Sequence, residues 1–168
     1  MARNLITIDE TRFIFGTNFA GDPAKGGKFR STARYGNIII PKSLAAELLR
    51  DGYNVRETTP RPIDGPDFEP EHFIKIVAKY DGPYPPKIYL VSGDSEPVLM
   101  NKDSLVDIDR ARIAKVRVVL NPWKDDDMGK SSFYIRTMYV EQDVESDPFA
   151  RYYARPRRRD DDEEQLPF

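Results

Sequence analysis

The sequence predicts an all-β fold: a β-rich barrel with one or two short helices, loop insertions and a disordered acidic C-terminal tail. Apolar and polar residues alternate over most of the 168 residues, as they do in strands that bury one face. The 10 glycines and 14 prolines divide the chain into short segments. Near its C-terminus, residues 160–164 are five consecutive acids, which repel one another and bury no apolar surface. We expect one domain over residues 1–153 and a flexible basic-then-acidic tail over residues 154–168.

Six segments carry the strand pattern, and two short helices interrupt them. The first helix, over residues 43–50, has an apolar leucine and alanine stripe, Ser43 as its N-cap and Gly52 as the left-handed residue after its end. The second begins near Asn101 and has a weaker pattern. Residues 57–70 and 121–130 are polar and are interpreted as long loops. The predicted strands are residues 11–15, 28–40, 71–80, 86–91, 115–120 and 132–140.

The charge of the chain is divided between a basic body and an acidic tail. There are 26 Lys and Arg residues against 28 Asp and Glu residues, five of which stand together at 160–164. Without those five, 23 acids remain and the body carries a net charge of +3. A mildly basic body suits a polyanionic ligand, and the acidic tail is able to compete for the same surface.

Residue usage leaves little material for catalysis. There is no cysteine, which rules out disulfides, thiolate metal sites and cysteine nucleophiles. His72, the single histidine, is interpreted as a solvated residue at the start of a strand. Asp125, Asp126 and Asp127, with Asp107 and Asp109, are the acids from which a two-metal nuclease site could be built. The three adjacent acids project in different directions, and no paired Glu and Lys stands on a nearby strand, so we do not expect such a site. We predict no enzyme activity, no cofactor and no metal.

The sequence lacks the marks of a membrane protein. No apolar run approaches the roughly 18 residues of a membrane-spanning helix, and the N-terminus has no signal-peptide apolar region. We expect a cytoplasmic protein, in the host cell cytoplasm if it is viral, that makes no membrane contact.

Several predicted strand faces combine aromatic and basic residues, because alternate residues of a strand share a face. Over residues 132–140, this alternation puts Met138 on the face of Tyr134 and Arg136, opposite Phe133 and Ile135. Single-strand binding without sequence preference needs cations that follow the phosphates and flat rings on which bases stack. Among barrels of this size, the OB fold is the commonest that binds single strands. The predicted single-stranded DNA (ssDNA) contacts are Lys28, Arg30, Arg34, Tyr35, Tyr53, Arg56, Phe73, Lys75, Lys79, Lys115, Arg117, Trp123, Tyr134 and Arg136.

Each aromatic residue in this set has a second interpretation. Tyr and Phe are favoured in strands, and an isolated one is more often part of the packing than of a binding surface. Trp123 follows Asn121 and Pro122 in a polar stretch, so it is either exposed or an anchor folded back onto the barrel mouth.

The C-terminal tail has the composition of a partner-binding segment. An apolar tip beside a free carboxylate, at the end of a flexible acidic segment, is suited to bind a small hydrophobic pocket rimmed by Lys or Arg on a partner protein. The alternative is that the acids only aid solubility. The preceding basic run, 155–159, is either a nucleic-acid patch or a solvated linker balanced by the acids. The predicted partner-binding residues are Asp160, Asp161, Asp162, Glu163, Glu164, Leu166, Pro167 and Phe168.

Several short motifs are distributed along residues 18–153. The most specific is Asp51-Gly52-Tyr53-Asn54-Val55-Arg56, and the others are Asn18-Phe19-Ala20-Gly21, Arg34-Tyr35, Pro85-Pro86-Lys87-Ile88, Pro122-Trp123 and residues 132–140. Together these motifs resemble the phage-encoded single-stranded DNA-binding proteins with a divergent OB fold. The family more often has Trp at the position of Tyr53 and Lys at that of Arg56.

The resemblance implies an OB fold, sequence-independent ssDNA binding and a part in phage DNA replication, recombination or repair. The acidic, Phe-ended tail resembles that of bacterial single-stranded DNA-binding proteins more widely, which implies that it recruits replication or recombination proteins. Two other functions stay open at this point: a protein-interaction scaffold of a phage complex, and an RNA-binding OB module. Homo-oligomerisation is also left open.

Overall fold

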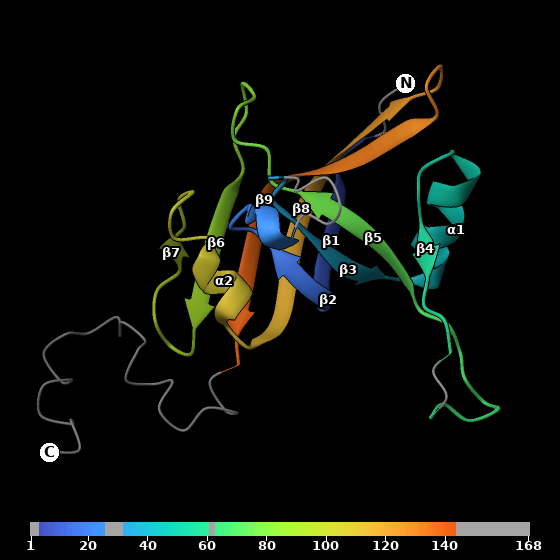
Figure 1. Ribbon diagram of the computed structural model, residues 1–168, viewed down its shortest axis with the longest axis horizontal. Helices are drawn as coiled ribbons and strands as arrows, with labels where there is room; N and C mark the ends of the chain where they lie inside the picture. The colour runs from blue at the N-terminus through green and yellow to red at the C-terminus, as the bar shows by residue number, and fades with distance from the viewer. Residues whose placement is uncertain (1–3, 26–31, 61–62, 144–168) are drawn as a thin grey trace, which may run out of the picture.

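The computed structural model describes residues 4–25, 32–60 and 63–143. In these residues the chain is β-rich, with two α-helices and one short 3-10 helix (Figure 1). The elements in chain order are β1 (Ile6–Thr11), β2 (Phe13–Asn18), η1 (Pro23–Lys25), β3 (Tyr35–Ile40), α1 (Lys42–Arg50), β4 (Arg56–Glu57), β5 (His72–Val77), β6 (Lys87–Ser92), β7 (Val98–Leu99), α2 (Val106–Arg110), β8 (Ile113–Asp125) and β9 (Lys130–Gln142).

One bent stretch of chain closes the sheet into a barrel. The strand order is β1-β8-β9-β5-β3-β2, and only Arg12 separates β1 from β2 at the two ends of that order. β1 pairs with β8 and β2 pairs with β3, so both edges of the sheet belong to the same stretch. β5 and β9 run parallel, and the other neighbours on this path are antiparallel. Counting β1 and β2 as one strand gives the five-stranded barrel of an OB fold, as the sequence predicted.

The remaining elements are insertions between barrel strands. α1 and β4 occupy the connection from β3 to β5, while β6, β7 and α2 occupy the connection from β5 to β8. β6 pairs in parallel with the C-terminal half of β9, from Lys87 opposite Thr137 to Ser92 opposite Gln142. The first half of β9 therefore pairs with β5 and the second half with β6.

The barrel core consists of the inward-facing residues of alternating strands. In β3, Gly36, Ile38 and Ile40 are buried and the residues between them are partly exposed. Burying a Val, Leu, Ile, Phe or Met side chain contributes about 1.5–3 kcal/mol to stability. The core residues with at most 1% exposure include Phe19, Ile38, Leu48, Ile74, Ile76, Ile88, Leu105, Ile108, Val116, Val118, Leu120 and Met138.

The predicted loop over residues 121–130 is wrong, because most of it is strand. β8 and β9 are 13 residues each and pair from Ile113 opposite Gln142 to Asp125 opposite Lys130. Their shared end projects beyond the body of the barrel as a two-stranded ribbon (Figure 1). Because the ribbon tip has no core to cover, its residues are polar on both faces and lack the alternation that indicates a strand.

The predicted faces of residues 132–140 are correct only at their start. Phe133 and Ile135 are buried, but Met138 and Val140 are buried too, although the alternation puts them on the face opposite Phe133 and Ile135. The pairing of β8 with β9 shifts by one residue between Val119 and Leu120, and the shift inserts Arg136 as an extra residue in β9. Such a bulge reverses the alternation that follows it.

The other boundaries differ by smaller amounts. The predicted strand at 28–40 is β3, which begins at Tyr35, and residues 26–31 lie outside the described part of the chain. The first helix is confirmed, but its N-cap is Pro41 rather than Ser43 and has no side-chain hydrogen bond. Gly52 has the predicted left-handed conformation, with φ of 89°. In the part of the chain that the structure describes, no helix is long and apolar enough to cross a membrane.

Candidate nucleic-acid interface

The outer face of β3, β5 and the start of β9 gathers aromatic and basic side chains. In the β3–β5 pair, Tyr35 lies opposite Val77 and Asn37 lies opposite Lys75. Val77 in turn lies opposite Tyr134 in the parallel β5–β9 pair. Paired residues of neighbouring strands point to the same side of a sheet, so Tyr35, Lys75 and Tyr134 share the outer side of the barrel.

Two lysines on this side lie over aromatic rings. The Lys75 Nζ atom is 4.5 Å from the centroid of the Tyr35 ring, and the Lys79 Nζ atom is 5.6 Å from that of Tyr134. Cation–π pairs at exposed sites contribute about 0.5–1 kcal/mol each. Both lysines are exposed, so the pairs hold each ammonium beside a ring while leaving it open to an anion.

Phe15 extends this surface at the start of β5. Its ring contacts that of Phe73 edge-on, with centroids 5.2 Å apart and ring planes at 79°, and it is 64% exposed. Phe73 is 7% exposed, so it is a supporting residue with little free ring surface for the stacking role predicted for it. Phe15 has a φ of 64°, a conformation that costs a residue with a side chain roughly 1–2 kcal/mol. We call Phe15, Tyr35, Phe73, Lys75, Lys79 and Tyr134 the aromatic face.

Tyr53 is buried, which removes the exposed ring that its predicted stacking role requires. It is 4% exposed, and its ring packs against Phe133 with centroids 5.4 Å apart. The Lys124 ammonium lies 5.4 Å from its ring centroid and donates a hydrogen bond to the Asp51 carbonyl. The neighbouring Asn54 N–H donates to Ser131 Oγ at 3.0 Å. Tyr53 and its neighbours therefore connect the end of α1 to the β8–β9 ribbon.

Trp123 lies on the ribbon opposite Ser132 and is 42% exposed. This exposure favours the exposed interpretation over the buried anchor. A hollow of about 550 Å³ beside it is lined mainly by Tyr53, Asn54, Lys130 and Ser131.

Arg34, predicted to bind DNA, instead holds the connection that follows β2. Its Nη1 donates hydrogen bonds to the carbonyl oxygens of Phe19 at 2.7 Å and Lys102 at 3.3 Å. Asp109 holds the same turn, accepting from the N–H groups of Phe19 at 2.8 Å and Ala20 at 2.9 Å. A guanidinium satisfied by backbone carbonyls has fewer donors left for phosphate.

A known protein family matches nearly the whole chain. Residues 2–165 match the family model described as "Putative phage ssDNA-binding domain". The chain belongs to this family.

Three solved structures of the single-stranded DNA-binding protein from bacteriophage Enc34 are also similar to the chain. The C-terminal truncation has a TM-score of 0.48 at 11% identity, and the complex with ssDNA has 0.49 at 11% identity; each comparison covers 83% of this chain and 86% of the other. A third has a TM-score of 0.47 at 10% identity and covers 94% of this chain and 86% of the other. A search of curated proteins finds no match.

In this member of the phage ssDNA-binding domain family, two of the other predicted cations, Lys115 and Arg117, lie apart from the aromatic face. Lys115 forms ion pairs with Glu141 at 3.5 Å and Glu10 at 3.8 Å. Arg117 lies opposite Tyr139, whose ring stacks on that of Tyr89 with centroids 4.8 Å apart. This part of the surface mixes acids with bases and is a poorer match for a polyanion than the aromatic face.

Two further predicted cations lie closer to the aromatic face. Arg56 is exposed and lies opposite Phe73 in the β4–β5 pair. Arg136 is the exposed extra residue of the β9 bulge, two residues after Tyr134. Lys28, Arg30 and all eight predicted tail residues, Asp160 to Glu164 and Leu166 to Phe168, lie outside the described residues.

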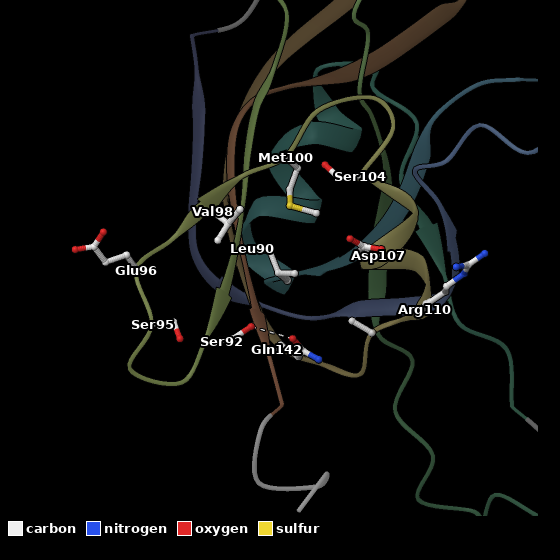
Figure 2. A pocket seen from close by; sticks show the side chains of 11 residues that line it. Leu90, Ser92, Ser95, Glu96, Val98, Met100, Ser104, Asp107, Arg110 and Gln142 are labelled. Atoms are coloured by element: carbon white, nitrogen blue, oxygen red, sulfur yellow. Dashed lines mark hydrogen bonds between the residues drawn. The ribbon is translucent and has the colours of Figure 1, made fainter. Parts of the chain in front are cut away.

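A second hollow, of about 530 Å³, lies on the inserted elements rather than on the aromatic face. Figure 2 shows Leu90, Val98 and Met100 on one side of it and Ser104 and Asp107 on the other. Ser92 donates a hydrogen bond to Gln142 at 2.9 Å at its edge. Among the described residues, no group of three or more His, Asp or Glu side chains is arranged to hold a metal ion.

Phe15, Tyr84 and Tyr139 are exposed aromatic residues outside the set of predicted contacts. Phe15 sits in an alternating segment, and alternation cannot reveal the left-handed conformation that exposes its ring. Tyr84 is 88% exposed in the connection from β5 to β6. The sequence does indicate the exposure of Tyr84, because an aromatic residue among Gly82, Pro83 and Pro85 lies in a loop and not in a core.

Proposed function

We propose that this chain is a non-catalytic protein that binds single-stranded DNA without sequence preference. The observation that carries the proposal is the aromatic face, where rings and ammonium groups alternate along β5. In an OB fold, the outer side of the second and third strands binds oligonucleotides, and here these strands are β3 and β5. The family to which the chain belongs supports the same function.

The aromatic face has the two components that single-strand binding needs. Stacking of a base on an aromatic side chain is worth about 1–3 kcal/mol and tolerates every base, because each base has a π-face. Lys75 and Lys79 lie beside Tyr35 and Tyr134, so each ring that accepts a base has a cation within reach of the adjacent phosphate. A duplex keeps its bases stacked inside the helix, so it has no free base face on which these rings can stack.

We assign the C-terminal tail a separate role in phage DNA replication, recombination or repair. In this proposal, the acids at 160–164 compete with DNA for the basic surface, and the Leu166-Pro167-Phe168 tip recruits replication or recombination proteins. The support is the composition of the sequence: five acids, then two apolar residues around a proline. Deleting residues 160–168 should leave the affinity for ssDNA equal or higher, whereas Phe168→Ala should leave it unchanged and lose partner recruitment.

The binding proposal is tested by fluorescence anisotropy with labelled oligo-dT, at several salt concentrations, against a duplex of equal length. We expect strong preference for the single strand and an affinity that falls steeply with salt. Lys75→Ala should weaken binding and reduce the salt slope by about 0.7, the value for one lost phosphate contact on a single strand. Equal affinity for single strand and duplex at low salt would contradict the proposal.

Lys115→Ala is the matched control for Lys75→Ala. Both lysines are exposed strand residues, but Lys115 is paired with Glu10 and Glu141. We expect its replacement to change affinity little. Competition with oligo-U then ranks DNA against RNA, and a scaffold protein would bind neither.

A further inference from the structure

Phe15 combines a strained backbone with an exposed ring. Among the residues that the structure describes, it is the one non-glycine residue with positive φ, at 64°. Such a conformation is a genuine outlier for a bulky residue, whereas glycine adopts it freely. Its ring is nevertheless 64% exposed, so the folded chain gains little burial from keeping phenylalanine there.

The unusual conformation determines where the ring points. Phe13 packs inward on Phe19, with ring centroids 5.5 Å apart, and Ile14 lies opposite Asn37. Regular alternation would therefore turn Phe15 inward again. The β2–β3 pairing instead shifts after Ile14, and the Phe15 ring lies outside, against Phe73. Bulges of this kind re-aim side chains near functional sites.

The position of the ring fits a base-binding role. Phe15 lies over the start of β5, on the outer side that carries Lys75, and Arg56 lies opposite Phe73 in the adjacent strand. An edge-on contact with Phe73 leaves the ring supported at one side, and its exposure leaves a surface on which an unpaired base can stack.

We propose that Phe15 is a base-stacking residue at the β4 end of the ssDNA path, that Phe73 supports its ring, and that Arg56 contacts the phosphate beside it. The ligand is an unpaired nucleobase of any identity, because stacking reads no hydrogen-bond pattern. The strained residue re-aims an aromatic ring from the core side to the DNA side. This inference rests on the proposed ssDNA-binding function and assigns one end of that site.

The alternative is that Phe15 merely covers Phe73. Substitution by leucine separates the two roles, because leucine keeps an apolar cover and the same backbone requirement but has no aromatic face. Tryptophan keeps the stacking surface, and glycine removes both the ring and the strain.

The experiment measures oligo-dT affinity and thermal unfolding of the full chain for wild type, Phe15→Leu, Phe15→Trp and Phe15→Gly. We expect Phe15→Leu and Phe15→Gly to weaken binding about 5- to 100-fold, the loss of one stacked base. Phe15→Trp should bind within about threefold of wild type, and Phe15→Leu should keep the melting temperature of wild type. Phe15→Gly should unfold at the same or a higher temperature than Phe15→Leu.

The outcomes separate this inference from the proposed function. If wild type binds oligo-dT and Phe15→Leu binds equally well, the inference is overturned and ssDNA binding stands. If Phe15→Leu weakens binding only in proportion to a lower melting temperature, the residue is a cover and the inference is again overturned. If wild type itself does not bind oligo-dT, both are overturned.

Discussion

The ammonium group of Lys75 on β5 lies 4.5 Å from the ring centroid of Tyr35 on β3. The aromatic pair Phe15–Phe73 lies on one side of this contact, at the start of β5, and the pair Lys79–Tyr134 lies on the other side, just beyond the end of β5. Since successive residues of a strand rise about 3.4 Å, the stretch of β5 from Phe73 to Val77 is about 14 Å long, and Lys79 lies two residues beyond its end. That length accommodates a short run of unstacked nucleotides, with a cation between successive rings.

The Lys75–Tyr35 pair should act as a unit in DNA binding. We expect Tyr35→Ala to lower oligo-dT affinity by about 5- to 100-fold, and the effects of Tyr35→Ala and Lys75→Ala to be non-additive because the two side chains touch. A double-mutant cycle on oligo-dT affinity measures the coupling. Strict additivity would mean that ring and cation contact the DNA independently.

Tyr53 should matter for stability and not for stacking. Tyr53→Ala leaves a cavity between α1 and the ribbon, and truncations of buried aromatic residues cost about 3–5 kcal/mol. Tyr53→Phe keeps the packing and should have nearly the unfolding free energy and oligo-dT affinity of wild type. Urea denaturation measures the first quantity. A Tyr53→Phe protein that folds normally but binds DNA poorly would contradict this and show that the Tyr53 hydroxyl contributes to DNA binding.

Asp109 should be a structural residue of the β2–β3 connection. Its carboxylate accepts hydrogen bonds from Thr17 Oγ1 at 2.6 Å and from the N–H groups of Phe19 and Ala20. Hydrogen bonds to a charged group contribute about 1.5–3 kcal/mol, and Asp109→Ala removes the acceptor of all three, so the unfolding free energy should fall by at least that amount. Denaturation of Asp107→Ala, an exposed acid of the same helix, is the control.

Tyr80 should make the folded protein less stable at high pH. Burial raises the pKa of the Tyr80 hydroxyl above its usual value of 10.0, an effect that nearby Arg34 opposes. The unfolded chain therefore loses this proton first, and stability should fall as the pH rises from about 10 through the folded pKa. Tyr80→Phe should reduce that loss. Thermal unfolding between pH 8 and pH 11 tests this, and identical pH profiles for both proteins would contradict it.

The barrel was predictable where one strand face meets the core. β3 and β5 bury alternate residues such as Ile38, Ile74 and Ile76, and this alternation is visible in the sequence. The ribbon was not predictable in this way, because strands that extend beyond the core bury neither face. The bulge at Arg136 was also hidden, since one inserted residue reverses all later faces without any change in composition.

The candidate site was predictable in kind but not in every member. Tyr35, Lys75, Lys79 and Tyr134 were expected from the aromatic and basic residues of the predicted strands, and register brings them to one surface. Tyr53 and Arg34 belong to the motifs that resemble the family, yet their contacts are structural: one packs on Phe133 and the other holds backbone carbonyls. A sequence motif indicates that a residue type is required and does not say whether packing or binding requires it.

Ultraviolet cross-linking of oligo-dT to the full-length protein, with the linked residues located by mass spectrometry, tests the central claim most directly. We predict cross-links on the aromatic face, at Tyr35, Tyr134 and Phe15, and their loss when unlabelled oligo-dT is added in excess. Cross-links confined to the surface around Tyr89 and Tyr139, apart from the aromatic face, would contradict the claim that single-stranded DNA lies along β3 and β5.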